Sequence, residues 1–250
     1  MNNEKIKIAI IMPAYNCEDT IKKSILSVIN QTYTNWHLYI INDCSVDNTS
    51  IILEDYFLND KITIIENEEN IGAAGSRNRG ITLSTEPIIA FIDSDDLWNE
   101  NKLLLQVEEI AKGEKFIITD YDYIEQSTQR TFSVSWGKKY LTEKDFVKKK
   151  FRVCFSSLLY IRCENQFKKI GHEDFVFLFE LFKLYGDAKV INKNLVSYIS
   201  VENSLSSNKK KAIIWHVNCL KYIFNDNYLK VIYYFLYYMV NGILFKRKNR

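Results

Sequence analysis

Short apolar runs rich in isoleucine alternate with amphipathic segments through the first half of the chain. The apolar runs predict strands over residues 7–15, 37–43, 61–67, 87–93 and 115–121. Between them, apolar residues recur at helical spacing and predict helices over residues 18–32, 48–58, 72–83 and 99–111. Repeated strand-then-helix order is typical of an α/β fold, in which helices flank a mostly parallel central sheet.

Several of the predicted strands end in carboxylates. Asp43 stands at the end of the second strand, Asp93 and Asp95 at the end of the fourth, and Asp120 near the end of the fifth. Parallel strands bring their carboxyl ends to one rim, where such sheets bind ligands, so we expect these side chains to lie together. In "FIDSDDLW", Asp96 adds a third carboxylate within four positions. Their mutual repulsion must be offset by a cation or a cationic partner, and we predict a divalent metal.

The composition permits a full hydrophobic core. The 250 residues are 47% hydrophobic, with eight glycines and two prolines. The cysteines are odd in number and form no CxxC pair, which argues against a disulfide framework or a zinc site and favours reduced thiols in the cytosol: Cys17, Cys44, Cys154, Cys163 and Cys219. The first apolar run is too short for a signal peptide and is better interpreted as a strand.

The net charge of +2 conceals an asymmetry between the two parts of the chain. Residues 1–100 carry 7 basic and 16 acidic side chains, and the remainder carries 26 and 15. An acidic half that holds metal and a basic half that meets an anionic surface would explain this pattern, and so would ordinary solvated faces. The basic residues cluster at the C-terminus without a nucleic-acid-reading motif, so we expect no nucleic acid partner.

Five ordered motifs resemble family 2 glycosyltransferases, which are inverting enzymes of the GT-A fold. They are "IIMPAYNCEDTIKKSILSVINQTY", "IINDCSVDNT", "NIGAAGSRNRGI", "AFIDSDDLW" and, further on, "CFSSLLYIR" with "GHEDFVFLFELFKLYG". The resemblance covers about four-fifths of the chain, to about residue 208. It implies a GT-A domain over residues 1–208, with a nucleotide-sugar half at 1–98 and an acceptor and catalytic half at 99–208.

The resemblance implies a donor site for a UDP-sugar in the first half. By their place in the motifs, its residues would be Pro13, Ala14, Tyr15, Asp43, Arg77, Asp93 and Ser94. Asp43 would accept a hydrogen bond from the uracil ring, and Arg77 would lie near the diphosphate. Asp95 matches the last carboxylate of the DxD motif and would bind Mn²⁺ or Mg²⁺. Asp47 is favoured as a turn or capping residue.

A single-displacement inversion needs a general base, and the resemblance assigns Asp174 to this role with Glu173 beside it. A pair of acids at a helix N-terminus is also an ordinary structural feature, and that position tends to lower the pKa of a carboxyl. The helix that follows is apolar almost all round, so we expect it to be buried. Many relatives have a tryptophan in this helix, where this chain has phenylalanines. Asp96 is favoured as the cap of a helix that starts near Asn99.

Residues 209–250 are predicted to form two helices that break near residues 225–227. The uncharged run at 231–245 is short for a membrane span and precedes the basic end "KRKNR". We expect either a peripheral contact with the inner face of the cytoplasmic membrane or packing on the domain or a second subunit. The loop at 198–211 is either a cover for the donor or a polar linker.

The sequence therefore predicts a metal-dependent inverting glycosyltransferase. It would move a hexose or N-acetylhexosamine from a UDP-sugar to a hydroxyl of a lipid-linked glycan precursor, and it is compatible with an oligomer. Two alternatives remain: a phosphatase of the haloacid dehalogenase type that uses Asp93 and Asp95, and a non-catalytic nucleotide-sugar-binding protein. The phosphatase fits less well because its motif normally follows the first strand of the fold.

Overall fold

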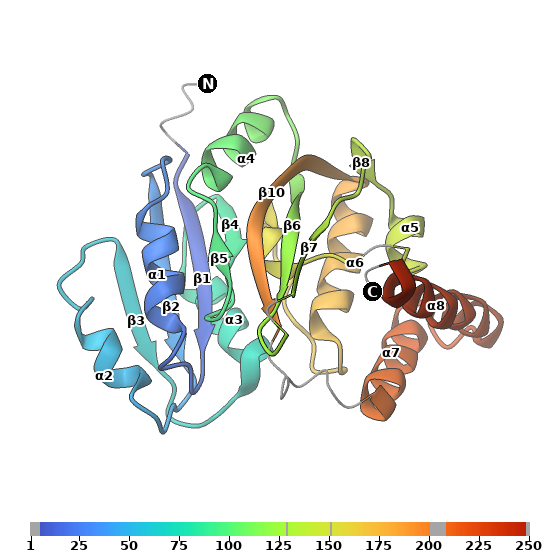
Figure 1. Cartoon of the computed structure of the whole chain (residues 1–250), viewed down its shortest axis with the longest axis horizontal. Coiled ribbons are helices and arrows are strands. Elements are labelled where there is room, and N and C mark those ends of the chain that lie inside the picture. The colour runs from blue at the N-terminus through green and yellow to red at the C-terminus, as the bar shows by residue number, and fades with distance from the viewer. Residues whose placement is uncertain (1–5, 129, 151, 201–208, 249–250) are drawn as a thin grey trace.

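The structure is a computed structural model that describes residues 6–128, 130–150, 152–200 and 209–248 (Figure 1). The first part alternates strands and helices: β1 (Ile8–Ala14), α1 (Ile21–Ile29), β2 (Trp36–Asn42), α2 (Thr49–Glu54), β3 (Ile62–Glu66), α3 (Gly72–Leu83), β4 (Ile88–Phe91), β5 (Leu97–Trp98) and α4 (Lys102–Ala111). The predicted strands and helices of this part are all present; α3 has the predicted bounds, β2 is shifted by one residue, and the others are shorter. Residues 201–208 of the predicted loop and the last two residues of the chain, 249–250, lie outside the described residues.

The second part begins with the predicted strand at residues 115–121, which is β6, and adds strands that the sequence pattern did not predict. It comprises β6 (Phe116–Glu125), β7 (Arg130–Val134), β8 (Tyr140–Leu141), α5 (Glu143–Val147), the 3-10 helix η2 (Phe155–Ser157), β9 (Leu159–Ile161), α6 (Glu173–Tyr185), β10 (Ala188–Ser200), α7 (Lys209–Ile223) and α8 (Tyr228–Lys248). The helix α6 is buried on nearly every side, as predicted, through residues such as Phe177 and Leu181.

Among the described residues, ten strands form one sheet in the order β3-β2-β1-β4-β9-β6-β10-β5, with β7 paired to β6 and β8 to β10. The strands β3, β2, β1 and β4 are parallel, as predicted. The strand β9 is antiparallel to both of its neighbours, β4 and β6. The result is a mixed sheet flanked by helices, and the carboxyl ends of β1, β2 and β3 share the lower rim in Figure 1.

Helix α3 lies unusually close to the sheet because Gly80 has no side chain. A Cβ at Gly80 would lie 2.6 Å from Cγ2 of Ile11 in β1 and 3.0 Å from Cδ1 of Ile41 in β2. Both isoleucines are fully buried, so neither can move aside easily. The glycine therefore sets the distance between α3 and the strands that it covers.

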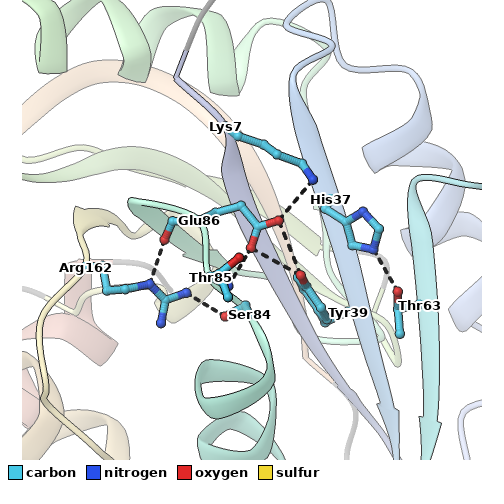
Figure 2. A network of polar contacts seen from close by, with 8 residues as sticks. All are labelled: Lys7, His37, Tyr39, Thr63, Ser84, Thr85, Glu86 and Arg162. Atoms are coloured by element: carbon cyan, nitrogen blue, oxygen red, sulfur yellow. Dashed lines mark hydrogen bonds and ion pairs between the residues drawn. The ribbon is translucent and has the colours of Figure 1, made fainter.

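A polar network ties the strands together at the opposite, amino-terminal edge (Figure 2). The buried Glu86 carboxylate is 3.2 Å from Nζ of Lys7 and accepts from the Tyr39 hydroxyl. Burial and the Glu86 charge raise the pKa of Tyr39 to about 12. Arg162, which follows β9, donates to the Glu86 carbonyl and to Oγ of Ser84, both at 2.6 Å. These contacts hold β1, β2, β4 and β9 in place far from the rim.

The C-terminal helices α7 and α8 lie on the side of the molecule away from α2 and β3 (Figure 1). They are separated by a turn in which Asn225 and Asp226 adopt φ values of 48° and 56°, so the predicted break is confirmed. The segment Tyr228–Phe245 is long and apolar enough to cross a membrane by length and composition, with a mean hydropathy of 1.2, and only 6% of it is buried.

We predict opposite effects for two Gly-to-Ala substitutions in helices. In α8, Gly242 has no atom within 4 Å of an added Cβ, so Gly242→Ala should raise the free energy of unfolding by up to about 1 kcal/mol. Gly80→Ala should lower it by about 1–3 kcal/mol, because overpacking outweighs helix propensity. Urea unfolding followed by circular dichroism measures both. A stabilised Gly80→Ala variant would contradict the close approach of α3.

Candidate functional site

Asp43 anchors the start of α3 to the end of β2. Its backbone N–H donates to the Ala14 carbonyl at 2.8 Å. Its carboxylate is 3% exposed and accepts from the N–H groups of Ile71 (2.9 Å) and Gly72 (2.8 Å) and from Nδ2 of Asn67 (2.6 Å). An anion at this helix end stabilises free N–H groups and the helix dipole. A carboxylate has about four acceptor positions, so about one is left for the predicted uracil contact, which stays a prediction.

The turn after β4 is fixed from two sides. The Asp96 N–H donates to the Asp93 carbonyl at 3.1 Å and closes the turn. The Asp93 N–H donates to Oγ of Ser156 in η2 at 3.1 Å. Oγ of Ser24 in α1 donates to the Ser94 carbonyl at 2.9 Å. These bonds hold the backbone of the acidic turn in one conformation.

Arg77 of α3 joins this turn to the start of α6. Its Nη2 lies 2.5 Å from Oδ1 of Asp93, and its Nη1 lies 2.9 Å from Oδ1 of Asp174. The guanidinium carbon lies 4.8 Å from the ring centre of Phe155 and 5.4 Å from that of Phe167. Burial opposes the positive charge, but the carboxylates of Asp174 and Asp93 outweigh it and raise the pKa of Arg77. Arg77 therefore supplies part of the positive charge that we predicted a metal ion would supply.

Asp174 and Glu173 form the first turn of α6. The Asp174 side chain is 46% exposed and that of Asp93 is 29% exposed, so both can be approached from solvent. Desolvation by the surrounding protein raises the pKa of Asp174, while the Arg77 charge opposes the rise. Burial raises the pKa of Glu173 as well. The helix N-terminus was expected to lower the pKa of these carboxyls, but desolvation outweighs that effect. A raised pKa makes the Asp174 carboxylate a stronger base.

Asp95 differs from its neighbours because no cationic side chain among the described residues forms an ion pair with it. Burial and the Asp93 charge raise its pKa to about 6. No group of three or more His, Cys, Asp or Glu side chains arranged to hold a metal occurs in the described part of the chain. Cations such as Mg²⁺ are commonly held by one or two carboxylates together with substrate phosphates, and Asp95 fits that arrangement.

The prediction that Asp96 caps the next helix is wrong. Helix α4 begins at Lys102, and Asn101 occupies the preceding position. Asp96 is fully buried and accepts from Oγ of Ser156 and from the Ile199 N–H at 3.2 Å. Burial and the neighbouring acidic charges raise its pKa well above the ordinary value. Its role is structural, as expected, but it joins the acidic turn to η2 and β10.

The prediction that Asp120 lies at the end of its strand is also wrong. The strand β6 continues to Glu125, so Asp120 lies within the strand instead of at its end. Its carboxylate accepts from Oγ of Ser135 at 2.6 Å and from the Trp136 N–H at 3.0 Å. These two donors satisfy a buried carboxylate that stabilises the connection after β7.

Other predicted site residues lie near the ends of β1 and β2. Pro13 and Ala14 are the last residues of β1, and the Ala14 side chain is buried. Tyr15 follows and is 51% exposed. The Asp47 carboxylate accepts from the Thr49 N–H at 3.0 Å, which confirms its turn role. The predicted donor contacts of Pro13, Ala14 and Tyr15 stay predictions.

Three residues around Arg77 were missed by the sequence prediction: Ser156, Phe155 and Phe167. Ser156 and Phe155 lie in "CFSSLLYIR", so that motif was a usable signal. Ser156 fixes both Asp93 and Asp96, and Phe155 contacts the guanidinium. Nothing in the local pattern distinguishes Phe167 from an ordinary core residue.

Comparison with known proteins identifies the class of protein to which this fold and site correspond. Residues 9–166 match the sequence profile of Glycosyl transferase family 2, which is more than half of the chain. The chain belongs to glycosyltransferase family 2.

Two bacterial relatives match almost the whole chain. The UDP-Glc:alpha-D-GlcNAc-diphosphoundecaprenol beta-1,3-glucosyltransferase WfgD of Escherichia coli is 34% identical, over 94% of this chain and 93% of that protein. The putative teichuronic acid biosynthesis glycosyltransferase TuaG of Bacillus subtilis is 30% identical, over 97% and 98%. The chain is therefore a glycosyltransferase, which excludes the phosphatase and the non-catalytic binding protein.

Solved structures show the same GT-A fold. The S. aureus TarS fragment 1–349 in complex with UDP-GlcNAc superposes with a TM-score of 0.71 at 18% identity, over 89% of this chain and 68% of that one. The mannosyltransferase PcManGT from Pyrobaculum calidifontis, in complex with GDP-Man and Mn²⁺, superposes with a TM-score of 0.62 at 15% identity, over 90% and 66%. The predicted family and fold are confirmed.

We predict that Arg77→Lys lowers the free energy of unfolding by about 2 kcal/mol. A lysine carries one compact charge and cannot donate to Asp93 and Asp174 together, so a carboxylate in this crowded site loses its partner. Arg79→Lys is the matched control. Arg79 lies on the same helix, but it donates to uncharged groups, the backbone carbonyl of Glu66 and the side-chain amide oxygen of Asn67. Urea unfolding at pH 7.5 compares the two variants. Equal losses of unfolding free energy in the two variants would show that the bridge from Arg77 to two carboxylates adds no stability beyond that of an ordinary arginine contact.

Proposed function

We propose that this glycosyltransferase moves a hexose or N-acetylhexosamine from a UDP-sugar to a hydroxyl of a lipid-linked glycan precursor, with inversion. The observation that carries the proposal is the bridge through Arg77. It holds Asp174, the proposed base, against Asp93 of the DxD turn, so that the proposed proton acceptor and the proposed donor site are adjacent. The name of WfgD supports the donor class, the undecaprenol-linked acceptor and a β-linked product.

Asp174 removes the proton of the acceptor hydroxyl as its oxygen attacks the anomeric carbon. The new bond forms as the bond from that carbon to the UDP phosphate oxygen breaks, and UDP leaves from the opposite face. The exposed part of the Asp174 carboxyl faces solvent, where an acceptor can enter. Arg77 fixes the other oxygen and limits rotation of the carboxyl. Glu173 lies beside it and adds negative charge.

Asp95, together with the diphosphate oxygens, would hold Mn²⁺ or Mg²⁺. When bound, this ion supplies positive charge that stabilises the leaving diphosphate. Asp93 stays paired with Arg77, and the fixed turn around Ser94 keeps Asp95 in place. Asp43 would contact uracil with its remaining acceptor position, and Tyr15 would contact the base or ribose.

We propose that the reaction takes place at the inner face of the cytoplasmic membrane. WfgD acts on a diphosphoundecaprenol-linked sugar, and a lipid carrier of this kind resides in a membrane. The five cysteines are free thiols, which suits a cytoplasmic enzyme. A hydroxyl of the glycan part, near the membrane surface, would be the group that is glycosylated.

We predict that Asp174→Asn lowers the rate of sugar transfer by about 10²–10⁴-fold, because an amide cannot accept the hydroxyl proton. Binding of UDP, measured by calorimetry, should stay within about threefold, since the proposed donor contacts are on other residues. Asp187→Asn is the matched control, because Asp187 is exposed just beyond the same helix. Near wild-type transfer by Asp174→Asn would exclude Asp174 as the base.

We predict that a UDP-sugar raises the melting temperature more in the presence of Mn²⁺ than in the presence of EDTA. A ligand that binds only the native state stabilises it, and the metal should tighten binding of the diphosphate. In Asp95→Asn the Mn²⁺-dependent part of the shift should disappear, while Asp19→Asn, at an exposed aspartate of the same charge, should keep it. A Mn²⁺-dependent shift of full size in Asp95→Asn would remove Asp95 from the proposed metal site.

A further inference from the structure

The outer face of α8 presents a continuous apolar stripe. Leu229, Ile232, Leu236, Val240 and Ile243 follow one another at steps of three or four residues, and each is at least 54% exposed. Soluble monomers rarely expose apolar surface over so many consecutive turns, so such a surface usually marks an interaction site.

The inner face of α8 is attached to the protein by polar and cationic contacts. Nζ of Lys148 lies 4.1 Å from the ring centre of Tyr237, and Nδ2 of Asn241 donates to the Lys148 carbonyl at 2.8 Å. The Arg152 guanidinium lies 4.2 Å from the ring centre of Phe245. A spanning orientation would carry these charges into hydrocarbon at a high cost. The helix is therefore placed to lie along a surface, with one face on protein and the other free.

The charge of this part of the chain is strongly positive. Residues 209–250 carry nine basic side chains and one acidic one, Asp226, whereas residues 101–208 carry 17 basic and 14 acidic. Most of the basic excess of the second part of the chain is thus concentrated in the two C-terminal helices and the end that follows them. An apolar stripe accompanied by cations matches an interfacial helix on an anionic membrane.

We propose that the apolar stripe of α8 docks flat on an anionic lipid surface. A second copy of the chain would fit the apolar stripe but would bring two strongly basic segments together, whereas anionic headgroups neutralise them. The choice of lipid as the occupant rests in part on the proposed function, since a lipid-linked acceptor must be met at a membrane.

The docked surface is connected closely to the proposed base. In α7, the Cys219 thiol donates to the His172 carbonyl at 3.6 Å, and Trp215 packs against Gly171. Both contacted residues directly precede Glu173 and Asp174. Tyr238 of α8 stacks on His216 of α7, with ring centres 4.0 Å apart. Membrane docking through α8 therefore fixes the start of α6 near the lipid surface, where the acceptor diphosphate lies.

The test is co-sedimentation of the full chain with vesicles of phosphatidylcholine alone or with 30% phosphatidylglycerol. The wild type should partition to the phosphatidylglycerol vesicles at least tenfold better, and high salt should weaken this binding. Ile232→Glu with Leu236→Glu should lower the partition coefficient more than tenfold. The matched control, Phe57→Glu with Leu58→Glu, changes two exposed apolar residues after α2 and should bind as the wild type does.

Thermal unfolding of each variant and light scattering without vesicles complete the test. Equal vesicle binding by the two double variants, or no binding by the wild type, would overturn the proposal. A dimer that only the Ile232→Glu/Leu236→Glu variant loses, without vesicle binding, would assign the stripe to a second copy instead. Transfer to a water-soluble acceptor is measured in parallel. If the wild type binds vesicles but shows no transfer, the proposed function fails and docking stands. If the wild type shows transfer but does not bind vesicles, docking alone fails.

Discussion

The Arg77 guanidinium holds the site together, because it is buried and must keep two carboxylates from different parts of the fold. Asp93 lies in the turn after β4, and Asp174 lies at the start of α6. A buried cation without these partners would be costly, whereas the two carboxylates are partly exposed. The three elements that carry them are therefore stable only in one relative position.

The close packing of α3 on the sheet places that guanidinium. Gly80 lies one turn after Arg77 and permits the contact of α3 with Ile11 and Ile41. Asp43 holds the other end of the helix through the Ile71 and Gly72 N–H groups. The Arg77 guanidinium is thus positioned by a glycine on one side and by a carboxylate on the other. Neither Gly80 nor Asp43 takes part in the proposed proton transfer, yet the position of Arg77 depends on both.

The first half of the fold could be predicted because its signals are local. Isoleucine-rich runs define β1, β2 and β4, of which β1 and β4 are buried on both faces, and helical spacing defines α1 and α4. The strand β10 could not be found in this way, because its pairing with β6 is interrupted by two register shifts around the polar Asn194. The three-residue strand β9 is too short to carry a pattern, and its direction depends on partners distant in sequence.

The candidate site was predictable residue by residue from its motifs but not as an arrangement. The motifs identified Arg77, Asp93 and Asp174, yet the ion pair between Arg77 and Asp174 joins residues 97 positions apart. The local sequence around an arginine does not indicate which distant carboxylate it will pair with. The prediction for Asp120 failed for a related reason, since the end of β6 depends on its pairing with β7 and β10.

The three carboxylates of the acidic turn occupy three different environments, and this difference explains why the chain can hold them together. Asp93 is paired with Arg77, and Asp96 is buried with donors from Ser156 and Ile199. Asp95 has no ion-pair partner in the described part of the chain, and burial beside Asp93 raises its pKa to about 6. Two of the three groups are thus stabilised by the protein itself. Only the third would gain from a cation brought with the substrate, which limits the requirement for metal to one carboxylate instead of three.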